Sequence, residues 1–215
     1  MIKKEKPIVA LFDCDGVVVD TESQYSVLWN ALGEEFQTGI PDFGYKIKGQ
    51  TLTHILATYF PEKERQERLV EKLLDYERNM HYDYIPGVYA FIQDLRKHGC
   101  KVVLVTSSDQ LKMSHVYKAH PEFKSLFDRI LTSEDFTASK PDPYCYLLGA
   151  KLFDAPQENC MVFEDSFNGI KAGMSAGIFT VGLATTNSRE AISPCCNHVI
   201  DDFTGFTYQS MMGLL

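Results

Sequence analysis

From Pro86 onward, short apolar runs alternate with segments of helical periodicity, and this alternation constrains the fold more than any other feature of the chain. The runs Cys100–Thr106 and Cys160–Glu164 are apolar almost throughout, as expected of strands buried on both faces of a parallel sheet. A similar run, Ile8–Phe12, lies near the N-terminus. We therefore predict an α/β fold: a Rossmann-like, doubly wound parallel sheet with helices on both faces. Shorter strands are expected at Arg129–Leu131, Ile178–Leu183 and His198–Ile200, and helices at Val88–His98, Leu111–Ala119, Pro143–Phe153 and Phe167–Ala176.

A long segment of helical periodicity separates the first apolar run from the others. Within residues 21–84, apolar side chains recur at spacings of three and four, as at Leu28 and Leu32. We expect this segment to form an all-helical cap domain. The Rossmann-like core would then comprise residues 1–20 and 85–215, with the cap inserted after the first strand of the sheet.

The composition restricts the partners that we expect. Lys and Arg total 21 and Asp and Glu total 29, so the formal net charge is −8. A surface this acidic repels a phosphate backbone, which argues against nucleic acid as a partner. No apolar run approaches the ~20 residues that a membrane-spanning helix needs. We expect a monomer or weak dimer that binds a small molecule.

The six cysteines form no Cys-x-x-Cys pair and no regular framework. Four of them fall within predicted strands, helices or a polar motif, where a free buried thiol is the ordinary interpretation. Adjacent Cys195 and Cys196 have no His or Cys partner at the spacing of metal ligands, so we interpret them as loop residues and leave their role open. This cysteine usage predicts a cytoplasmic protein.

Acidic residues follow two of the predicted strands. Ligands of a doubly wound sheet bind beyond the carboxyl ends of its strands. The first run ends in Asp13 and Asp15, and a spacing of two places both carboxylates on one side of an extended chain. Glu164 and Asp165 end the Cys160–Glu164 run. Four carboxylates at one edge would repel one another without a cation, and ligands that are all oxygen suit Mg²⁺.

Hydrogen-bond donors are expected at the same edge. Thr106 and Ser107 end the second strand and offer hydroxyl and amide groups. Lys140 precedes a helix that begins with a proline. These donors, together with Mg²⁺, would stabilise a phosphoryl group under attack by a carboxylate. The second aspartate could then protonate the departing oxygen and later accept a proton from water.

Four segments in this order resemble motifs I to IV of the haloacid dehalogenase (HAD) superfamily: Asp13-x-Asp15-Gly-Val, Thr106-Ser107, Lys140-Pro141 and Glu164-Asp165-Ser. The predicted helical insert is similar to a C1-type cap, so the resemblance covers essentially the whole chain. The residues around Lys140 and Glu164 look most like those of the β-phosphoglucomutase-like branch of small-sugar phosphatases and mutases.

The resemblance implies catalytic and metal-binding roles. Asp13 would be the nucleophile that forms an aspartyl-phosphate, and it would also bind Mg²⁺. Asp15 would be the general acid and base, with its backbone carbonyl oxygen on the metal. Asp165 would be a direct metal ligand. Glu164 would be either another ligand or a residue that supports the ligands.

The resemblance also implies substrate-binding roles. Thr106 and Lys140 would bind the phosphoryl group, helped by the backbone amide of Ser107. Lys48 falls where the cap loop of the family reaches into the active site. We therefore expect Lys48 to contact the substrate from the cap side.

Departures from the mutase pattern affect the expected activity. The resemblance aligns Tyr25 with a histidine of the mutases, Leu52 with an arginine and Asp109 with a lysine. A mutase must hold a sugar bisphosphate by both ends, and Leu52 and Asp109 remove two cations. We therefore expect a Mg²⁺-dependent phosphatase of a small phosphorylated metabolite, with phosphosugars as the expected class. One alternative is β-phosphoglucomutase, and another is a non-catalytic phosphate-binding or regulatory protein on the same fold.

Overall fold

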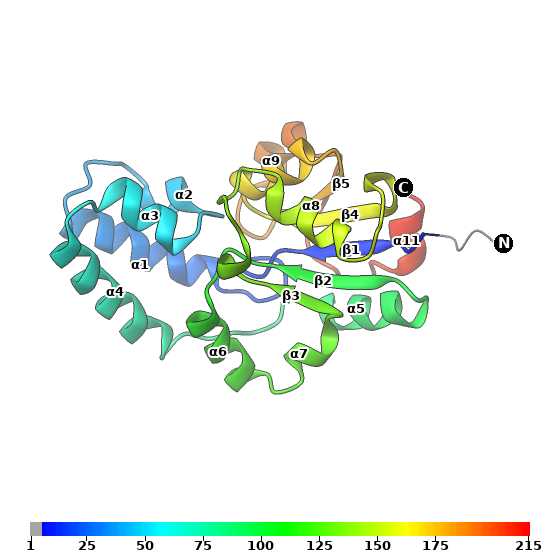
Figure 1. Cartoon of the computed structure of the whole chain (residues 1–215), viewed down its shortest axis with the longest axis horizontal. Coiled ribbons are helices and arrows are strands. Elements are labelled where there is room, and N and C mark those ends of the chain that lie inside the picture. Colours follow the sequence, from blue (N-terminus) through cyan, green and yellow to red (C-terminus); the bar gives the residue numbers. More distant parts are fainter. Residues whose placement is uncertain (1–5) are drawn as a thin grey trace.

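Six parallel strands form one sheet in the order β3-β2-β1-β4-β5-β6, as seen in the computed structural model of the chain, which describes residues 6–215 (Figure 1). This order reverses direction at β1 and β4, as in doubly wound sheets, and it confirms the predicted fold class. The strands are β1 Val9–Phe12, β2 Lys101–Val105, β3 Arg129–Leu131, β4 Cys160–Glu164, β5 Phe179–Leu183 and β6 His198–Ile200.

The central strands are buried on both faces, because helices cover each side of the sheet. On one face, the rings of Phe12 and Phe163 stack with centroids 4.7 Å apart. On the other face, Leu11 packs so closely against Gly149 that a Cβ there would lie 2.6 Å from a Leu11 methyl group. Packing on both faces fixes the positions of β1 and β4, and therefore the positions of the residues that follow them.

The helices of the core lie in two layers (Figure 1). The apolar residues of α5, α6, α7 and α11 share one hydrophobic cluster with Phe12 and Phe163, whereas those of α8 and α9 share a second cluster with Leu11. The core helices are α5 Val88–Lys97, α6 Gln110–Ala119, α7 Phe123–Leu126, α8 Tyr144–Lys151, α9 Phe167–Ser175, α10 Arg189–Ile192 and α11 Tyr208–Met212. Single-turn 3-10 helices occur at Ser133–Asp135, Gln157–Asn159 and Ser193–Cys195.

Four helices between β1 and α5 pack together at the end of the molecule opposite α11 (Figure 1). They are α1 Glu22–Glu35, α2 Phe43–Ile47, α3 Leu52–Tyr59 and α4 Lys63–Glu77. Their common core includes Trp29, Phe43 and Phe60, whose rings meet edge to face. These helices cover the carboxyl ends of the strands, so they also cover any site at that edge of the sheet. We refer to the segment of residues 21–84 as the cap.

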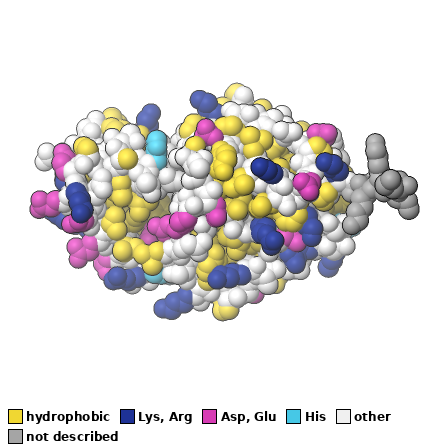
Figure 2. Space-filling model, in the orientation of Figure 1, with side chains coloured by type: hydrophobic (Ala, Val, Ile, Leu, Met, Phe, Trp, Pro, Cys, Tyr) yellow, Lys and Arg dark blue, Asp and Glu magenta, His cyan; other side chains and the backbone are white. Residues whose placement is uncertain are grey.

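The surface carries charges of both signs. On the face shown in Figure 2, Lys and Arg side chains are scattered among acidic and apolar ones rather than gathered in one region. Within residues 6–215, no helix combines the length and apolar character needed to cross a bilayer. All six cysteines are free; Cys195 is exposed and Cys196 is half-buried.

Candidate active site

β1 and β4 are neighbouring parallel strands, so their carboxyl ends lie side by side. Phe12 pairs with Phe163 in register, and the N–H of Asp13 donates to the carbonyl oxygen of Phe163 at 3.1 Å. Beyond Asp13 the chain turns at Gly16, whose φ of +73° lies in the left-handed region. A Cβ on Gly16 would lie 2.1 Å from an Asp165 carboxylate oxygen, so only glycine lets this turn approach Asp165.

Lys140 is buried between two carboxylates. Its Nζ donates to Asp13 Oδ1 at 2.7 Å, to Glu164 Oε1 at 2.8 Å and to the carbonyl oxygen of Val105 at 3.2 Å. An ammonium group has three donors, so these contacts use all of them. The residue is only 2% exposed. Lys140 therefore fixes the carboxylate of Asp13 relative to Glu164.

Glu164 is enclosed by donors. Its Oε1 accepts from Lys140 and from the hydroxyl of Tyr146 at 2.9 Å. Its Oε2 accepts from the N–H of Asp165 at 2.9 Å and from the N–H and hydroxyl of Ser166 at 3.0 and 3.1 Å. A carboxylate has about four lone-pair positions, so five donors saturate Glu164.

The carboxylates of Asp13, Glu164 and Asp165 could share a metal ion. Each offers an oxygen atom, and these atoms lie within 4.8 Å of one another. Burial, reinforced by Glu164 and Asp15 and only partly offset by Lys140, raises the pKa of Asp13 to about 8. Burial and nearby carboxylates likewise raise the pKa of Asp165 well above its usual range. Its Oδ2 is buried and makes no hydrogen bond, so the donor set and this unpaired oxygen both fit Mg²⁺.

Asp15 is held differently from Asp13. The hydroxyl of Thr21 donates to its Oδ1, whereas Lys112 Nζ and the hydroxyl of Ser108 donate to its Oδ2 at 2.5 and 3.0 Å. Burial opposes ionisation of Asp15, but Lys112 and these hydrogen bonds outweigh it and lower the pKa of the carboxyl group. Two aspartates only two positions apart are thus held in opposite electrostatic environments.

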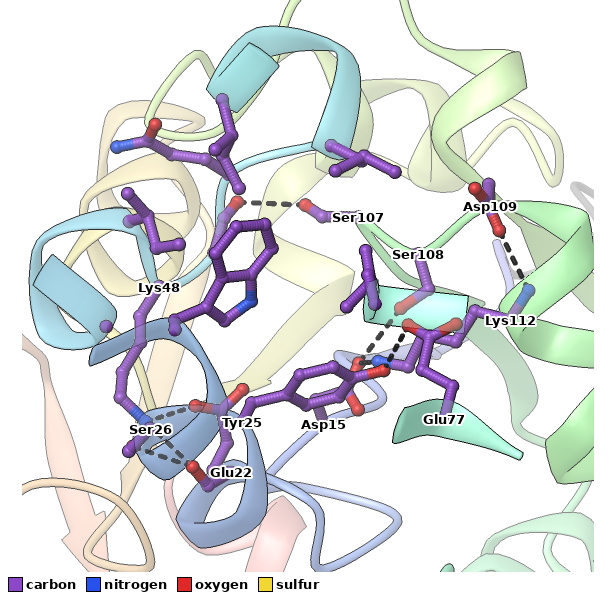
Figure 3. Close-up of a pocket in the computed structure, with 18 of the residues that line it drawn as sticks. Asp15, Glu22, Tyr25, Ser26, Lys48, Glu77, Ser107, Ser108, Asp109 and Lys112 are labelled. Carbon is purple, nitrogen blue, oxygen red and sulfur yellow. Dashed lines mark hydrogen bonds and ion pairs between the residues drawn. The ribbon is translucent and has the colours of Figure 1, made fainter. Parts of the chain in front are cut away.

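A pocket of about 800 Å³, open solvent included, extends from Asp13 and Asp15 toward the cap (Figure 3). Its core side is polar and its cap side is mainly apolar. The core side is lined by Asp13, Asp15, Ser107, Ser108, Asp109 and Lys112. The apolar lining of the cap side comprises Tyr25, Trp29, Ile47, Leu52, Ile55, Leu73 and Leu74, and its charged lining comprises Glu22, Lys48 and Glu77.

The structure gathers the residues predicted from the sequence at this edge, but not all of them line the pocket. Lys48 lines it and forms an ion pair with Glu22 (Figure 3). The side chain of Thr106 is fully buried, and its hydroxyl accepts from the N–H of Ser108 at 3.1 Å. Lys140 is likewise buried behind Asp13. The pocket wall next to Asp13 therefore comes from Ser107 and Ser108 rather than from Thr106.

Lys112 is a functional candidate that was not predicted from the sequence. It is 8% exposed and lies in the first turn of α6, where Asp109, the N-cap residue, accepts from its N–H at 2.8 Å. The sequence does carry a signal for Lys112, which lies in the first turn of the helix that follows the second strand. Such a turn lies at the edge of the sheet where the strand ends. Asp109 aligns with a lysine of the mutases, and Lys112 lies three residues after it.

One cap loop contacts the core directly. The carbonyl oxygen of Lys48 accepts from Asn168 Nδ2 at 2.7 Å, and that of Gly49 accepts from the hydroxyl of Ser107 at 2.9 Å. The N–H of Thr51 donates to the hydroxyl of Ser139 at 2.9 Å. These three hydrogen bonds hold the cap against the core.

Comparisons with known proteins identify the family. The model of the haloacid dehalogenase-like hydrolase family matches residues 9–177. A putative phosphatase from Bacillus subtilis is 31% identical over 176 residues, which cover 78% of this chain and 79% of the relative. The β-phosphoglucomutase of the same organism is 29% identical over 190 residues, which cover 80% of this chain and 81% of the relative.

A solved structure shows the same fold at lower identity. The structure of a putative β-phosphoglucomutase from Bacteroides vulgatus superposes with a TM-score of 0.82 and 20% identity, and covers 99% of this chain and 92% of that chain. The residues matched by the family model include Asp13, Thr106, Lys140 and Asp165. The chain therefore belongs to the haloacid dehalogenase-like hydrolases, in the branch that resembles β-phosphoglucomutase.

Proposed function

We propose that the protein is a Mg²⁺-dependent phosphatase that hydrolyses a small phosphorylated metabolite, with phosphosugars as the expected class. The observation that carries the proposal is the arrangement of two aspartates at the floor of one pocket. Asp13 is fixed by Lys140, and Asp15 is fixed by Lys112 and Ser108. A nucleophile and an acid–base group on neighbouring positions of one strand end suit a reaction in two displacement steps.

In the first step, the carboxylate of Asp13 attacks the phosphorus atom and the bond to the leaving oxygen breaks. Lys140 holds Asp13 Oδ1, so Oδ2 is the oxygen that is free to attack. Ser107 and Ser108 line the same pocket, where their hydroxyl groups donate to the carbonyl oxygen of Gly49 and to Asp15. Asp15 would supply a proton to the leaving oxygen, and the product is an aspartyl-phosphate on Asp13.

In the second step, water attacks the phosphorus atom of the aspartyl-phosphate. The bond between phosphorus and the Asp13 oxygen breaks, which regenerates the carboxylate. Asp15 takes the proton of the attacking water. Asp15 is in the ionised form that this step requires because it has given its proton to the leaving oxygen in the first step.

The proposed Mg²⁺ ligands are Asp13, Asp165 and the backbone carbonyl oxygen of Asp15. Bound Mg²⁺ would relieve the repulsion between the attacking carboxylate and the phosphoryl oxygens. Because five donors already saturate Glu164, we propose that it supports the site by holding Lys140 rather than by binding the ion directly.

The charges of the pocket support hydrolysis over a mutase reaction. Of the residues that line the pocket, Lys48 and Lys112 are the cations, and each is already paired with a carboxylate. Leu52 lines the pocket and supplies no charge. A second phosphate at the cap side would therefore meet few free cations. β-Phosphoglucomutase activity stays the alternative, because a relative with that name covers most of the chain.

We also propose that the protein works in the cytoplasm as a monomer or weak dimer. The absence of any disulfide among its six cysteines is consistent with a reducing compartment. Size-exclusion chromatography with light scattering tests the oligomeric state.

An assay with p-nitrophenyl phosphate, with and without Mg²⁺, tests the proposed chemistry. Wild-type protein should release phosphate only when Mg²⁺ is present. Asp13→Asn is nearly isosteric but cannot form the acyl-phosphate, so it should retain the fold and lose turnover. Turnover within tenfold of wild type would exclude Asp13 as the nucleophile. A screen of phosphorylated metabolites would then identify the substrate.

A further inference from the structure

We propose that Lys112 is a positioning residue that orients Asp15 for the hydrolysis of the aspartyl-phosphate, and that the cap holds Lys112 in place through Tyr25. The inference rests on the proposed function, because it takes the acid–base role of Asp15 from there. No role for Lys112 was expected from the sequence. The proposed role is supported by the contacts that Lys112 makes with the core and with the cap.

On the core side, the backbone of Lys112 is held in the first turn of α6, and its side chain binds Asp15. Its N–H donates to the N-cap side chain of Asp109, which fixes the first turn of the helix. Its Nζ lies 2.5 Å from Asp15 Oδ2, and the hydroxyl of Ser108 donates to the same oxygen at 3.0 Å. Oδ1 accepts one hydrogen bond, from Thr21, and so retains a lone pair for a proton. Lys112 and Ser108 therefore determine which oxygen of Asp15 remains available.

On the cap side, the ammonium group of Lys112 lies against an aromatic face. Its Nζ is 4.2 Å from the centroid of the Tyr25 ring, which is within the range of a cation–π interaction. The hydroxyl of Tyr25 donates to Glu77 Oε1 at 2.7 Å, so α1 and α4 of the cap fix the ring together (Figure 3). Lys112 is thus enclosed between a core carboxylate and a cap side chain.

This enclosure connects the position of the cap with the orientation of Asp15. When the cap covers the core, the Tyr25 ring excludes water from the ammonium group, and Asp15 is its strongest remaining partner. If the cap moves away, water replaces the ring and the ammonium group is no longer confined beside Asp15. Asp15 is then correctly oriented for water attack only while the cap is closed.

The two chemical steps should depend on Lys112 to different degrees. With p-nitrophenyl phosphate the leaving group departs as p-nitrophenolate, so the first step requires no proton from Asp15. The second step always requires Asp15, because the proton of the attacking water has to be accepted as the bond from phosphorus to Asp13 breaks. Loss of Lys112 should therefore slow the second step and spare the first.

Rapid mixing of p-nitrophenyl phosphate and Mg²⁺ with Lys112→Met tests this inference. Met approximates the length of the lysine stem and removes the charge. We expect a burst of about one p-nitrophenolate per active site, followed by a steady rate roughly 100-fold or more below that of wild type. Lys112→Arg should restore part of the steady rate. Lys118→Met, at an exposed position of the same helix, is the matched control and should behave as wild type.

Tyr25→Leu tests the cap side and serves as a second variant if Lys112→Met does not fold. It removes the aromatic face but leaves Lys112 and Asp15 in the chain, so a burst with a slowed steady rate is again expected. Equal loss of the first turnover and the steady rate in Lys112→Met would show a merely structural role and overturn the inference. Wild-type rates in Tyr25→Leu would overturn the part played by the cap. Failure of the wild-type protein to hydrolyse the ester would instead count against the proposed function.

Discussion

The backbone N–H of Asp20 donates a hydrogen bond to the carbonyl oxygen of Asp83, 2.8 Å away, where the chain enters and leaves the cap. The N–H of Ile85 donates to the carbonyl oxygen of Val18 at 3.0 Å in the same link. The two crossings therefore run side by side as a short antiparallel pair. Such a link allows the cap to rotate as one unit while its two ends stay together.

We predict that Gly49→Ala shifts the cap toward an open position. Gly49 has a φ of +76°, and a Cβ there would lie 2.7 Å from the hydroxyl oxygen of Ser166 on the core. Small-angle scattering should give a larger radius of gyration for the variant, and hydrogen exchange near Ser107 should be faster. Gly39→Ala is the control, because Gly39 has a similar φ of +69° but no atom within 4 Å of its Cβ position. An unchanged radius in Gly49→Ala would argue against a hinged cap.

Asp15→Asn should make turnover strongly dependent on the leaving group. The amide can neither donate the proton that an alkoxide leaving group needs nor accept one from water. Release of p-nitrophenolate in a single turnover should therefore persist, whereas release of an alkyl alcohol should fall by about 10²–10⁴-fold. Quenched-flow measurements with both esters distinguish the two effects. Equal losses for both leaving groups would show that Asp15 is not the acid.

Mg²⁺ should raise the melting temperature of the protein through Asp165. A ligand that binds only the folded state at 100 times its Kd stabilises that state by about 2.7 kcal/mol. Asp165→Asn removes the carboxylate whose Oδ2 is buried without a partner, and most of the Mg²⁺-dependent shift should vanish. Calorimetry with and without Mg²⁺ provides the measurement. Asp142→Asn, which changes a carboxylate outside the acidic cluster, should keep the wild-type shift.

Glu77→Gln should stabilise the protein at alkaline pH and have less effect near pH 5. Burial raises the pKa of Glu77 in the folded state, so its favourable contribution is present when it is protonated and is lost as the pH rises through the folded-state pKa. Gln still accepts the hydrogen bond of Tyr25 at every pH. Each kcal/mol gained at pH 8 should raise the melting temperature by about 2–4 °C. Glu71→Gln, at an exposed position of α4, is the control; a difference that does not depend on pH would contradict the prediction.

Leu52→Arg should increase the affinity for a sugar bisphosphate. Leu52 lines the cap side of the pocket, and a charge-assisted contact to a second phosphate contributes about 1.5–3 kcal/mol, equivalent to about tenfold or more in KM. Kinetics with glucose 1,6-bisphosphate measure the change, with Thr53→Arg, at an exposed position of the same helix, as control. Asp109 should be left intact, because it caps α6 and its loss would cost about 0.5–2 kcal/mol. Rapid formation of glucose 6-phosphate by the wild type would favour the mutase alternative.

The sequence predicted the sheet well because its strands are short, apolar and followed by distinctive polar residues. The bounds of β3, β4 and β6 agree with those predicted, β1 and β5 begin one residue later than predicted, and β2 is one residue shorter at each end. The helices α2, α7, α10 and α11 have five residues or fewer, too few to show a helical period, and they were not predicted.

The site was predicted less completely than the fold. Asp13, Asp15 and Asp165 end strands, so their positions follow from the topology of the sheet. Lys112 and Glu77 reach the pocket from helices whose rotation depends on packing against the rest of the molecule, which a single sequence does not reveal. The arrangement of Thr106 and Lys140 behind Asp13 likewise depends on side-chain directions at the strand ends.

The hydrogen bonds from Asn168 to Lys48 and from Ser107 to Gly49 have a consequence for the kinetics of turnover. We expect phosphate to leave the pocket after these contacts separate, and the contacts to form again before the next reaction. Opening is a property of the protein and is the same for every ester. Esters that differ widely in chemical reactivity should therefore approach one common limiting kcat once their chemistry is faster than this separation.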